Sequence, residues 1–186
     1  MRCRSTTRHR LRTTAGSVSV DQLDLRFAMS YDVAPLGKIC LCDIRSGTVE
    51  DHAVDGRPGQ ESYGAGEVFS FSPPDRPYRG RINQARYSIT MFDPGLLDQL
   101  ASPARDREPV RLLGHRPVTA AAGERLRRAI EHLDRDLLAD PAVLDKPLLV
   151  ATASRYLAAC VLDAFPNTAL TDRRAYGESP GRTLRG

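Results

Sequence analysis

Residues 64–92, GAGEVFSFSPPDRPYRGRINQARYSITMF, decide the fold that we predict for this chain. Phe69 and Phe71 alternate with serines, and this period of two predicts a strand with one buried and one wetter face. Three prolines between residues 73 and 77 remove backbone donors and fix φ, which excludes a central strand there. A second strand-like run covers residues 86–92. The stretch therefore predicts two strands joined by a β-corner at the end of a sheet or barrel.

The length and composition are those of a globular soluble protein. A chain of 186 residues buries a sizeable core and is most simply one domain with an appended subdomain. No apolar run approaches the roughly 18 to 20 residues that a membrane span needs. Residues 1–16 are charged and lack the apolar segment of a secretory signal. We therefore expect a cytoplasmic protein that does not associate with a membrane.

The net charge of +4 comes from the N-terminal end of the chain. Removing the five arginines there from the 27 basic residues leaves 22, beside 23 acidic residues. The rest of the chain is therefore nearly neutral, and its charge does not predict nucleic-acid binding. We expect residues 1–16 to form a basic arm that is disordered or a poorly fixed first strand. The five arginines are Arg2, Arg4, Arg8, Arg10 and Arg12.

The hydrophobic pattern changes from strand-like to helical at Asp93. Before it, roughly six to eight short strands with frequent turns are typical of a barrel or sandwich. Asp93 is expected to cap a short helix that has Pro94 at its first position. A long helix is then predicted over residues 119–139, and a second over residues 148–165. The second carries only two charges, so it needs burial on more than one side.

The sequence contains no motif that predicts an enzyme. Its four histidines are scattered, and none lies at metal-ligand spacing from another histidine or from a cysteine. A nucleophile elbow, a P-loop and a dinucleotide fingerprint are all missing. The four cysteines are interpreted as small buried hydrophobes. We expect no catalytic residues, no metal and no cofactor.

Aromatic side chains on the predicted strands are better placed for ligand binding, because small-molecule pockets often form at the mouths of β-barrels. Core packing is the alternative for the phenylalanines, and a surface corner is the alternative for Tyr78. For any single residue, packing is favoured over binding. The candidate ligand-binding residues are Phe27, Tyr31, Phe69, Phe71, Tyr78 and Tyr87.

The opening stretch also carries a resemblance to a known family. A Gly-x-Gly-acid turn, the corner PPDRPY and the closing MFDP resemble the N-terminal regulatory domain of AraC-type bacterial transcription regulators. LGHRPVT at residues 113–119 and FPNTAL at residues 165–170 fit the same resemblance, which covers roughly residues 16–170. It implies an α+β fold, in which a cupin-like β-barrel or jelly roll binds a small-molecule effector and two long antiparallel helices follow.

The resemblance also implies a domain organisation and a homodimer. The dimer interface is expected on the apolar stripe of the first long helix or on the apolar second helix. The stripe consists of Leu126, Ile130, Leu133 and Leu137. The expected parts are a basic arm at 1–16, the barrel at 17–93, a helical dimerisation subdomain packed on the barrel at 94–166, and a polar tail or linker at 167–186.

The chain departs from the family pattern after Phe165, because only about twenty residues follow it. A pair of helix-turn-helix units does not fit there, so we expect a regulatory domain truncated before its DNA-binding domain. DNA would then be contacted only through that absent domain. One alternative is a cupin-like metal-dependent enzyme, although the corner at residues 75–78 lacks the histidine such a site needs. Another is a stand-alone regulator that forms mixed dimers with full-length relatives.

Overall fold

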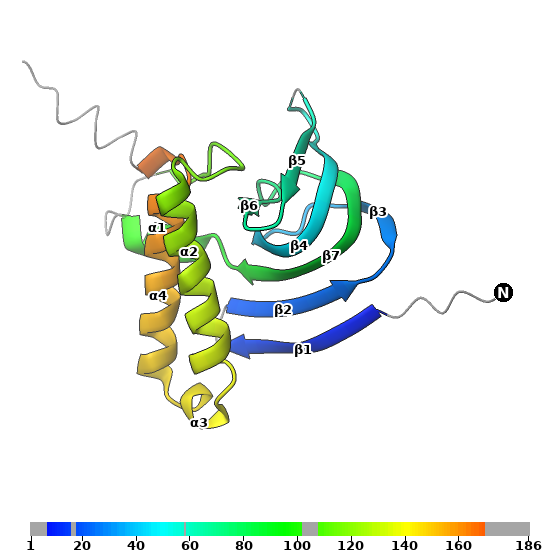
Figure 1. Ribbon diagram of the computed structural model, residues 1–186. Coiled ribbons are helices and arrows are strands. Elements are labelled where there is room, and N and C mark those ends of the chain that lie inside the picture. Colours follow the sequence, from blue (N-terminus) through cyan, green and yellow to red (C-terminus); the bar gives the residue numbers. More distant parts are fainter. Residues whose placement is uncertain (1–6, 16–17, 58, 102–107, 170–186) are drawn as a thin grey trace, which may run out of the picture.

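The structure is a computed structural model that describes residues 7–15, 18–57, 59–101 and 108–169, the first segment by its backbone alone. Among these residues the strands come first and the helices follow (Figure 1), as the predicted α+β class requires. The strands are β1 (Thr7–Ala15), β2 (Val18–Leu25), β3 (Ala28–Val33), β4 (Ile39–Val54), β5 (Glu61–Gly64), β6 (Val68–Ser70) and β7 (Tyr78–Phe92). The helices are α1 (Gly95–Ala101), α2 (Ala120–His132), the π-helix η1 (Leu133–Leu137), α3 (Pro141–Leu144) and α4 (Pro147–Ala164).

Strand β7 is the centre of the sheet, because β2, β3 and β4 all pair with it in antiparallel register. On one edge of β7, β3 pairs with residues 78–83 and β2 with residues 86–91. Strand β4 pairs along the other edge, and it also pairs with β5 and β6. The sheet curls on itself (Figure 1), which gives it a concave inner face.

Bulges bend the two long strands β4 and β7. The register between them shifts at three places between Ile44 and Ala53. Gly47 has a φ of +79°, and a Cβ atom there would lie 2.4 Å from the carbonyl oxygen of Gln84, so only glycine fits this crossing. Asp51 on β4 also has a positive φ of 52°. These irregularities allow one continuous strand to leave the flat part of the sheet and enter the curl.

The N-terminal arm is partly a strand, which is the second of the two alternatives expected for it. Residues 7–15 form β1, which pairs with β2 from Thr7 opposite Leu25 to Ala15 opposite Val18. The physical reason is that strand pairing satisfies backbone groups whatever the side chains are, so a polar, Arg-rich sequence does not prevent it. The remainder of the expected arm, and the tail from residue 170, lie outside the described residues. The division into a barrel at 17–93 and a helical subdomain at 94–166 stays a prediction.

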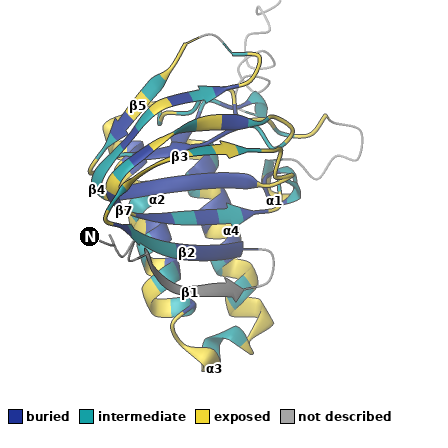
Figure 2. Ribbon diagram, turned by 90° about the vertical axis from the view of Figure 1, so that its right-hand side faces the viewer, coloured by how far each residue is buried: buried dark blue, intermediate teal, exposed yellow. Residues whose placement is uncertain are grey.

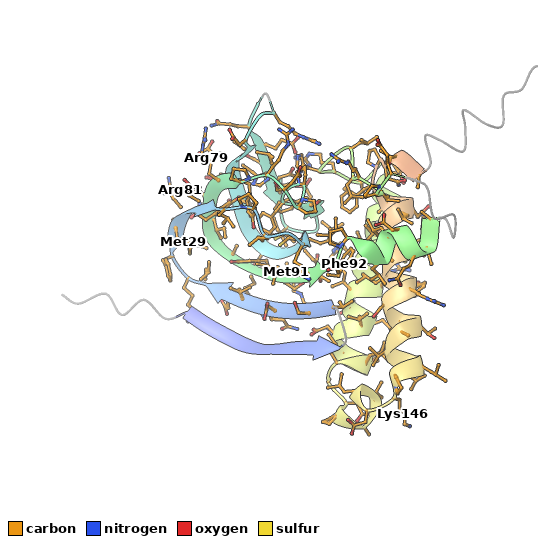
Figure 3. All side chains as sticks on the ribbon, turned by 180° about the vertical axis from the view of Figure 1, so that it is seen from behind. Met29, Arg79, Arg81, Met91, Phe92 and Lys146 are labelled. Carbon is orange, nitrogen blue, oxygen red and sulfur yellow. The ribbon has the colours of Figure 1, made fainter. Side chains whose placement is uncertain are left out.

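The central strands β4 and β7 carry buried side chains on both faces, and alternation along them assigns these side chains to one of two cores. On β4, Leu41 belongs to the core beneath the helices, whereas Cys40 and Cys42 belong to the core inside the curl. On β7, Phe92 and its neighbour Met91 (Figure 3) are divided in the same way. Buried positions accordingly extend along the central strands in Figure 2. Both cysteines of β4 are free and buried, as expected for small hydrophobes.

The helices begin at the predicted caps. The Thr119 hydroxyl accepts a hydrogen bond from the backbone N–H of Ala122 at 3.1 Å, and an Asp93 carboxylate oxygen accepts one from Gly95 at 2.9 Å. The predicted long helix over residues 119–139 is α-helical only in the 13 residues of α2. It then widens into η1, so the expectation of one long α-helix here is corrected.

The widening into η1 has a packing consequence. In a π-helix the backbone hydrogen bonds join residues five apart, and Leu133 and Leu138 are both buried in the same core. The backbone N–H of Leu138 donates to the carbonyl oxygen of Leu133 at 2.9 Å. The extra residue in the turn therefore keeps two leucines against the sheet where a regular helix would rotate one of them away.

The apolar stripe of α2 packs inside this chain, which corrects its expected role as a dimer interface. Leu126 is 0% exposed, and Ile130 and Leu133 are almost as deeply buried. All three belong to the same core as Leu157 and Val161 of α4, which lies beside α2 (Figure 1). An apolar stripe shows that a helix face needs burial, but not against which surface. Leu137, the fourth member of the expected interface, is partly exposed.

Helix α4 is unusually apolar for its length. Its 18 residues have a mean hydropathy of 1.3, which by length and composition alone would allow it to cross a membrane, contrary to the sequence-based expectation. One third of this segment is buried in the core. The buried side is formed by residues such as Leu157, Ala158 and Val161, which pack with α2 and the sheet. Core helices of soluble proteins have the same composition, so this feature is weak evidence for a membrane span.

We predict that Leu126→Ala will lower the free energy of unfolding by about 2 to 5 kcal/mol, because it leaves a cavity between α2, α4 and the sheet. Chemical denaturation followed by circular dichroism measures this change. The matched control is Leu36→Ala, which removes a leucine that is 41% exposed and should change stability by no more than about 0.5 kcal/mol. Equal, small effects of the two substitutions would contradict the assignment of Leu126 to the core.

Candidate functional site

His52 lies at the centre of an aromatic cluster inside the curl of the sheet. It is on β4 and is 2% exposed. Aromatic rings surround it, with centroids between 5.6 and 6.2 Å from the imidazole centroid. These rings, which together with His52 we call the aromatic cluster, belong to Tyr31, Tyr63, Phe69, Phe71 and Tyr78.

The hydrogen bonds of His52 determine its tautomer. Nε2 lies 2.7 Å from the backbone carbonyl oxygen of Phe71. A carbonyl oxygen only accepts, so Nε2 carries the proton and donates it. Nδ1 is then an acceptor, and the hydroxyl of Tyr31 donates to it at 2.8 Å. Burial lowers the pKa of His52 below its ordinary value of 6.5, which keeps the ring neutral.

Tyr31 reaches His52 because the residue opposite it has no side chain. Tyr31 is on β3 and pairs with Gly80 of β7. A Cβ atom at Gly80 would lie 2.4 Å from the Tyr31 hydroxyl oxygen and 2.7 Å from Cζ. The tyrosine ring therefore passes over Gly80 into the curl. Burial also raises the pKa of Tyr31, which keeps its hydroxyl protonated and able to donate.

A second histidine, which is partly buried, connects this cluster to the helices. His115 lies in the connector, residues 108–119, that leads from α1 into α2, and its ring centroid is 5.9 Å from that of His52. Its Nδ1 donates to the carbonyl oxygen of Ser70 at 2.8 Å, and the N–H of Ser70 donates to the His115 carbonyl oxygen at 2.9 Å. Nε2 is left as the acceptor for Arg57, at 3.3 Å. Burial lowers the pKa of His115 as well.

Arg116 covers one side of the cluster. Its guanidinium lies 4.4 Å from the centroid of the Tyr63 ring. The same group forms ion pairs with Glu61 and Glu67 and donates to the carbonyl oxygen of Ser62 at 2.6 Å. The charged groups are thus at the rim of the curl, while its interior is lined by neutral rings.

The structure brings all six predicted ligand-binding residues into or against one core inside the curl. Phe69, Phe71, Tyr78 and Tyr87 are buried there, and Phe27 and Tyr31 are partly buried against them. The alternative of a surface corner for Tyr78 is wrong, since it is 7% exposed. Whether these residues bind a ligand stays a prediction.

Sequence reasoning missed His52 and Tyr63. Strict alternation from the buried Val49 would place Asp51, and not His52, inside the curl. The bulge at Asp51 shifts the register between Val49 and His52, so that the histidine points inward instead. Tyr63, by contrast, lies on the short strand β5, whose four residues gave too little pattern. No signal in the sequence reveals the bulge, but the alternation of His52 with the buried Val54 was visible.

Metal ligands do not converge in the part of the chain that the structure describes. There, no group of three or more histidine, cysteine, aspartate or glutamate side chains is placed to hold a metal ion. Burial raises the pKa of Cys40 to about 12, so this thiol is protonated rather than a thiolate ligand. The sequence-based expectations of no metal, no cofactor and no enzymatic activity stay predictions.

Comparison with known proteins identifies the fold. No family model matches the sequence, and no curated protein is significantly similar to it. Among solved structures, the AraC-like transcriptional activator CuxR matches with a TM-score of 0.54 and 20% sequence identity, over 91% of this chain and 64% of that one. A putative mannose-6-phosphate isomerase from Ralstonia eutropha JMP134 matches with a TM-score of 0.39 and 6% identity, over 47% of this chain and 85% of that one. The cupin domain of Schizosaccharomyces pombe Cnp3 has a TM-score of 0.39 and 14% identity, over 50% and 69%.

The match to the activator confirms the predicted resemblance at the level of the fold. The curled antiparallel sheet and the helices that follow it are arranged as in this AraC-like activator. This chain spans less than two thirds of the length of that activator.

We predict that stability falls as the pH is lowered below about 6.5. The folded state lowers the pKa of His52 and His115, so on acidification the unfolded chain binds protons first. The free energy of unfolding therefore rises with pH across the window below the ordinary histidine value and is insensitive to these two groups above it. Urea denaturation between about pH 5.5 and about pH 7.5 measures the dependence.

His115→Gln should reduce this pH dependence, because one of the two histidines whose pKa is lowered in the folded state no longer titrates. His132→Gln is the matched control, since His132 is exposed on α2. A stability that is flat across this range in the unsubstituted protein would show that the fold does not hold these rings neutral.

Proposed function

We propose that this chain is the ligand-sensing and dimerisation domain of an AraC-type transcription regulator. The observation that carries the proposal is the likeness of fold, over 91% of this chain, to an AraC-like transcriptional activator. In this proposal the domain works in the cytoplasm as a homodimer and binds a small-molecule effector. DNA would be contacted by a helix-turn-helix domain of the complete regulator and not by the sheet or helices described above.

The aromatic cluster is the proposed effector site. It combines large apolar rings with a few oriented polar groups, which is the usual composition of small-molecule pockets. The polar group at its centre, His52, is neutral and has a defined tautomer. A single polar atom of known hydrogen-bonding character inside apolar walls gives both affinity and selectivity.

The outer face of α4 is the proposed dimer interface. Leu148 is 82% exposed, Tyr156 is 54% exposed, and Leu149 lies on the same exposed side. Arg155 is the charged residue among them. This surface was the second of the two interfaces that the sequence predicted. An exposed apolar surface of this kind typically marks an interaction site.

The outer face of α2 is less suitable as an interface. It carries ion pairs between charged side chains, including Arg128 with Glu124 and Arg135 with Glu131 in the continuation of the helix. Charged residues are depleted from the centres of interfaces, because burying them costs desolvation free energy. The outer face of α4, which is mostly apolar, is therefore a better candidate for the dimer interface than the charged outer face of α2.

We predict that a homodimer forms at tens of micromolar and that the double variant Leu148→Glu/Tyr156→Glu dissociates it, because two carboxylates would be buried in an apolar contact. Sedimentation velocity measures the association state, and circular dichroism verifies the fold. The control is Leu36→Glu, which adds a carboxylate at an exposed leucine away from α4. A monomeric unsubstituted protein, or a double variant that remains dimeric, would contradict the proposed interface.

A further inference from the structure

We propose that the ligand of the aromatic cluster is a small neutral phenol, which takes the place of the Tyr31 side chain at His52. The inference rests on the proposed ligand-sensing function and adds the chemical class of the ligand and the side chain that competes with it. In this proposal the Tyr31 side chain occupies the ligand site when no ligand is bound, and this is the state that the structure describes.

The requirement for a hydroxyl follows from the hydrogen bonds of His52. Its Nε2–H is committed to the carbonyl oxygen of Phe71, within the buried part of the sheet. Its Nδ1 accepts from the Tyr31 hydroxyl. A ligand that displaces Tyr31 must therefore donate a hydrogen bond to Nδ1, because a buried acceptor without a donor costs free energy. Ligands that only accept do not meet this requirement.

The requirement for an aromatic ring follows from the rings that surround the Tyr31 side chain. The Tyr31 ring contacts Phe71 and Tyr78 edge-on, at centroid distances of 6.0 and 5.9 Å. A second ring in the same place would make the same edge-to-face contacts, which add to the free energy of apolar burial. The charges of Glu61 and Arg116 lie at the rim. The interior therefore favours a neutral ring, because burying an unpaired charge is unfavourable.

Tyr31 is the ring of the cluster that is able to leave. Tyr63, Phe69, Phe71 and Tyr78 are all buried, whereas Tyr31 is partly exposed. Its strand, β3, has six residues and pairs with β7, and most of its side chains face solvent. Rotation of Tyr31 away from Gly80 would vacate the volume of one phenol ring without disturbing the backbone of β4 or β7. An apolar cavity of such a size binds single aromatic rings.

The first test measures binding of phenol and of toluene by isothermal titration calorimetry. Toluene is the matched control ligand, because it has a similar size and lacks the hydroxyl. We expect the unsubstituted protein to prefer phenol by about tenfold, the value of one buried hydrogen bond. Tyr31→Ala should bind phenol about tenfold more tightly than the unsubstituted protein, since the competing hydroxyl is removed. Leu36→Ala removes an exposed side chain away from both the aromatic cluster and α4, and it should leave phenol binding unchanged.

The second test removes the acceptor. In the double variant Tyr31→Ala/His52→Leu, phenol and toluene should bind with affinities within about twofold of each other, because neither finds a hydrogen-bonding partner. Thermal melts confirm that each variant is folded. Should Tyr31→Ala fail to fold, Tyr31→Phe takes its place, because it removes the hydroxyl that competes for His52 Nδ1 and keeps every ring of the cluster.

Two results would overturn the inference. One is equal binding of phenol and toluene to both the unsubstituted protein and the folded Tyr31 variant, and the other is absence of phenol binding to both. These results differ from a failure of the proposed function. If the aromatic cluster binds a ligand other than a phenol and dimerisation changes in response, the proposed function stands and only the phenol as ligand class is refuted. If the protein binds phenol through His52 but remains monomeric, the proposed dimerisation is refuted and the proposed ligand class stands.

Discussion

The pairing of β4 with β7 is the constraint on which the rest of the structure depends. These two long strands run side by side from Ile39 opposite Phe92 to Val54 opposite Tyr78. Because side chains alternate along each strand, this one pair of strands contributes side chains to the core beneath the helices on one face and to the aromatic cluster on the other. The helix side also holds a partly buried ion pair, Arg127 with the buried Asp43 at 2.7 Å, which links α2 to β4. Substituting either partner alone would destabilise the fold, because the other would be left as a poorly compensated charge.

The connector between α1 and α2 is the place where the two cores meet. His115 contacts His52 and is bonded to β6 through Ser70. On either side of it, the backbone N–H groups of Leu113 and Val118 donate to carbonyl oxygens at the C-terminal end of α4, both at 2.7 Å. One short segment is therefore bonded both to strand β6 and to the end of α4. The segment that packs against His52 through His115 leads directly into the N-cap of α2.

Local rules predicted much of the fold and part of the candidate site. Alternation identified Phe69 and Phe71 as inward residues, and the caps at Asp93 and Thr119 lie where the polar side chain precedes an apolar helical pattern. The six aromatic candidates were found because large rings on strands require burial. His52 was missed because a bulge at Asp51 reverses the alternation, and a bulge depends on how two strands are paired.

By itself, the sequence determined which faces require burial, where helices begin, and the order of strands before helices, because these properties depend on neighbours within a few residues. Only the tertiary structure decided what covers each face. It placed the Leu126 stripe against α4 within the same chain and left Leu148 exposed. It also made residues 7–15 a strand by pairing them with β2. The physical reason is that burial and backbone pairing can be satisfied by any surface of suitable shape, and contacts between distant segments choose which one.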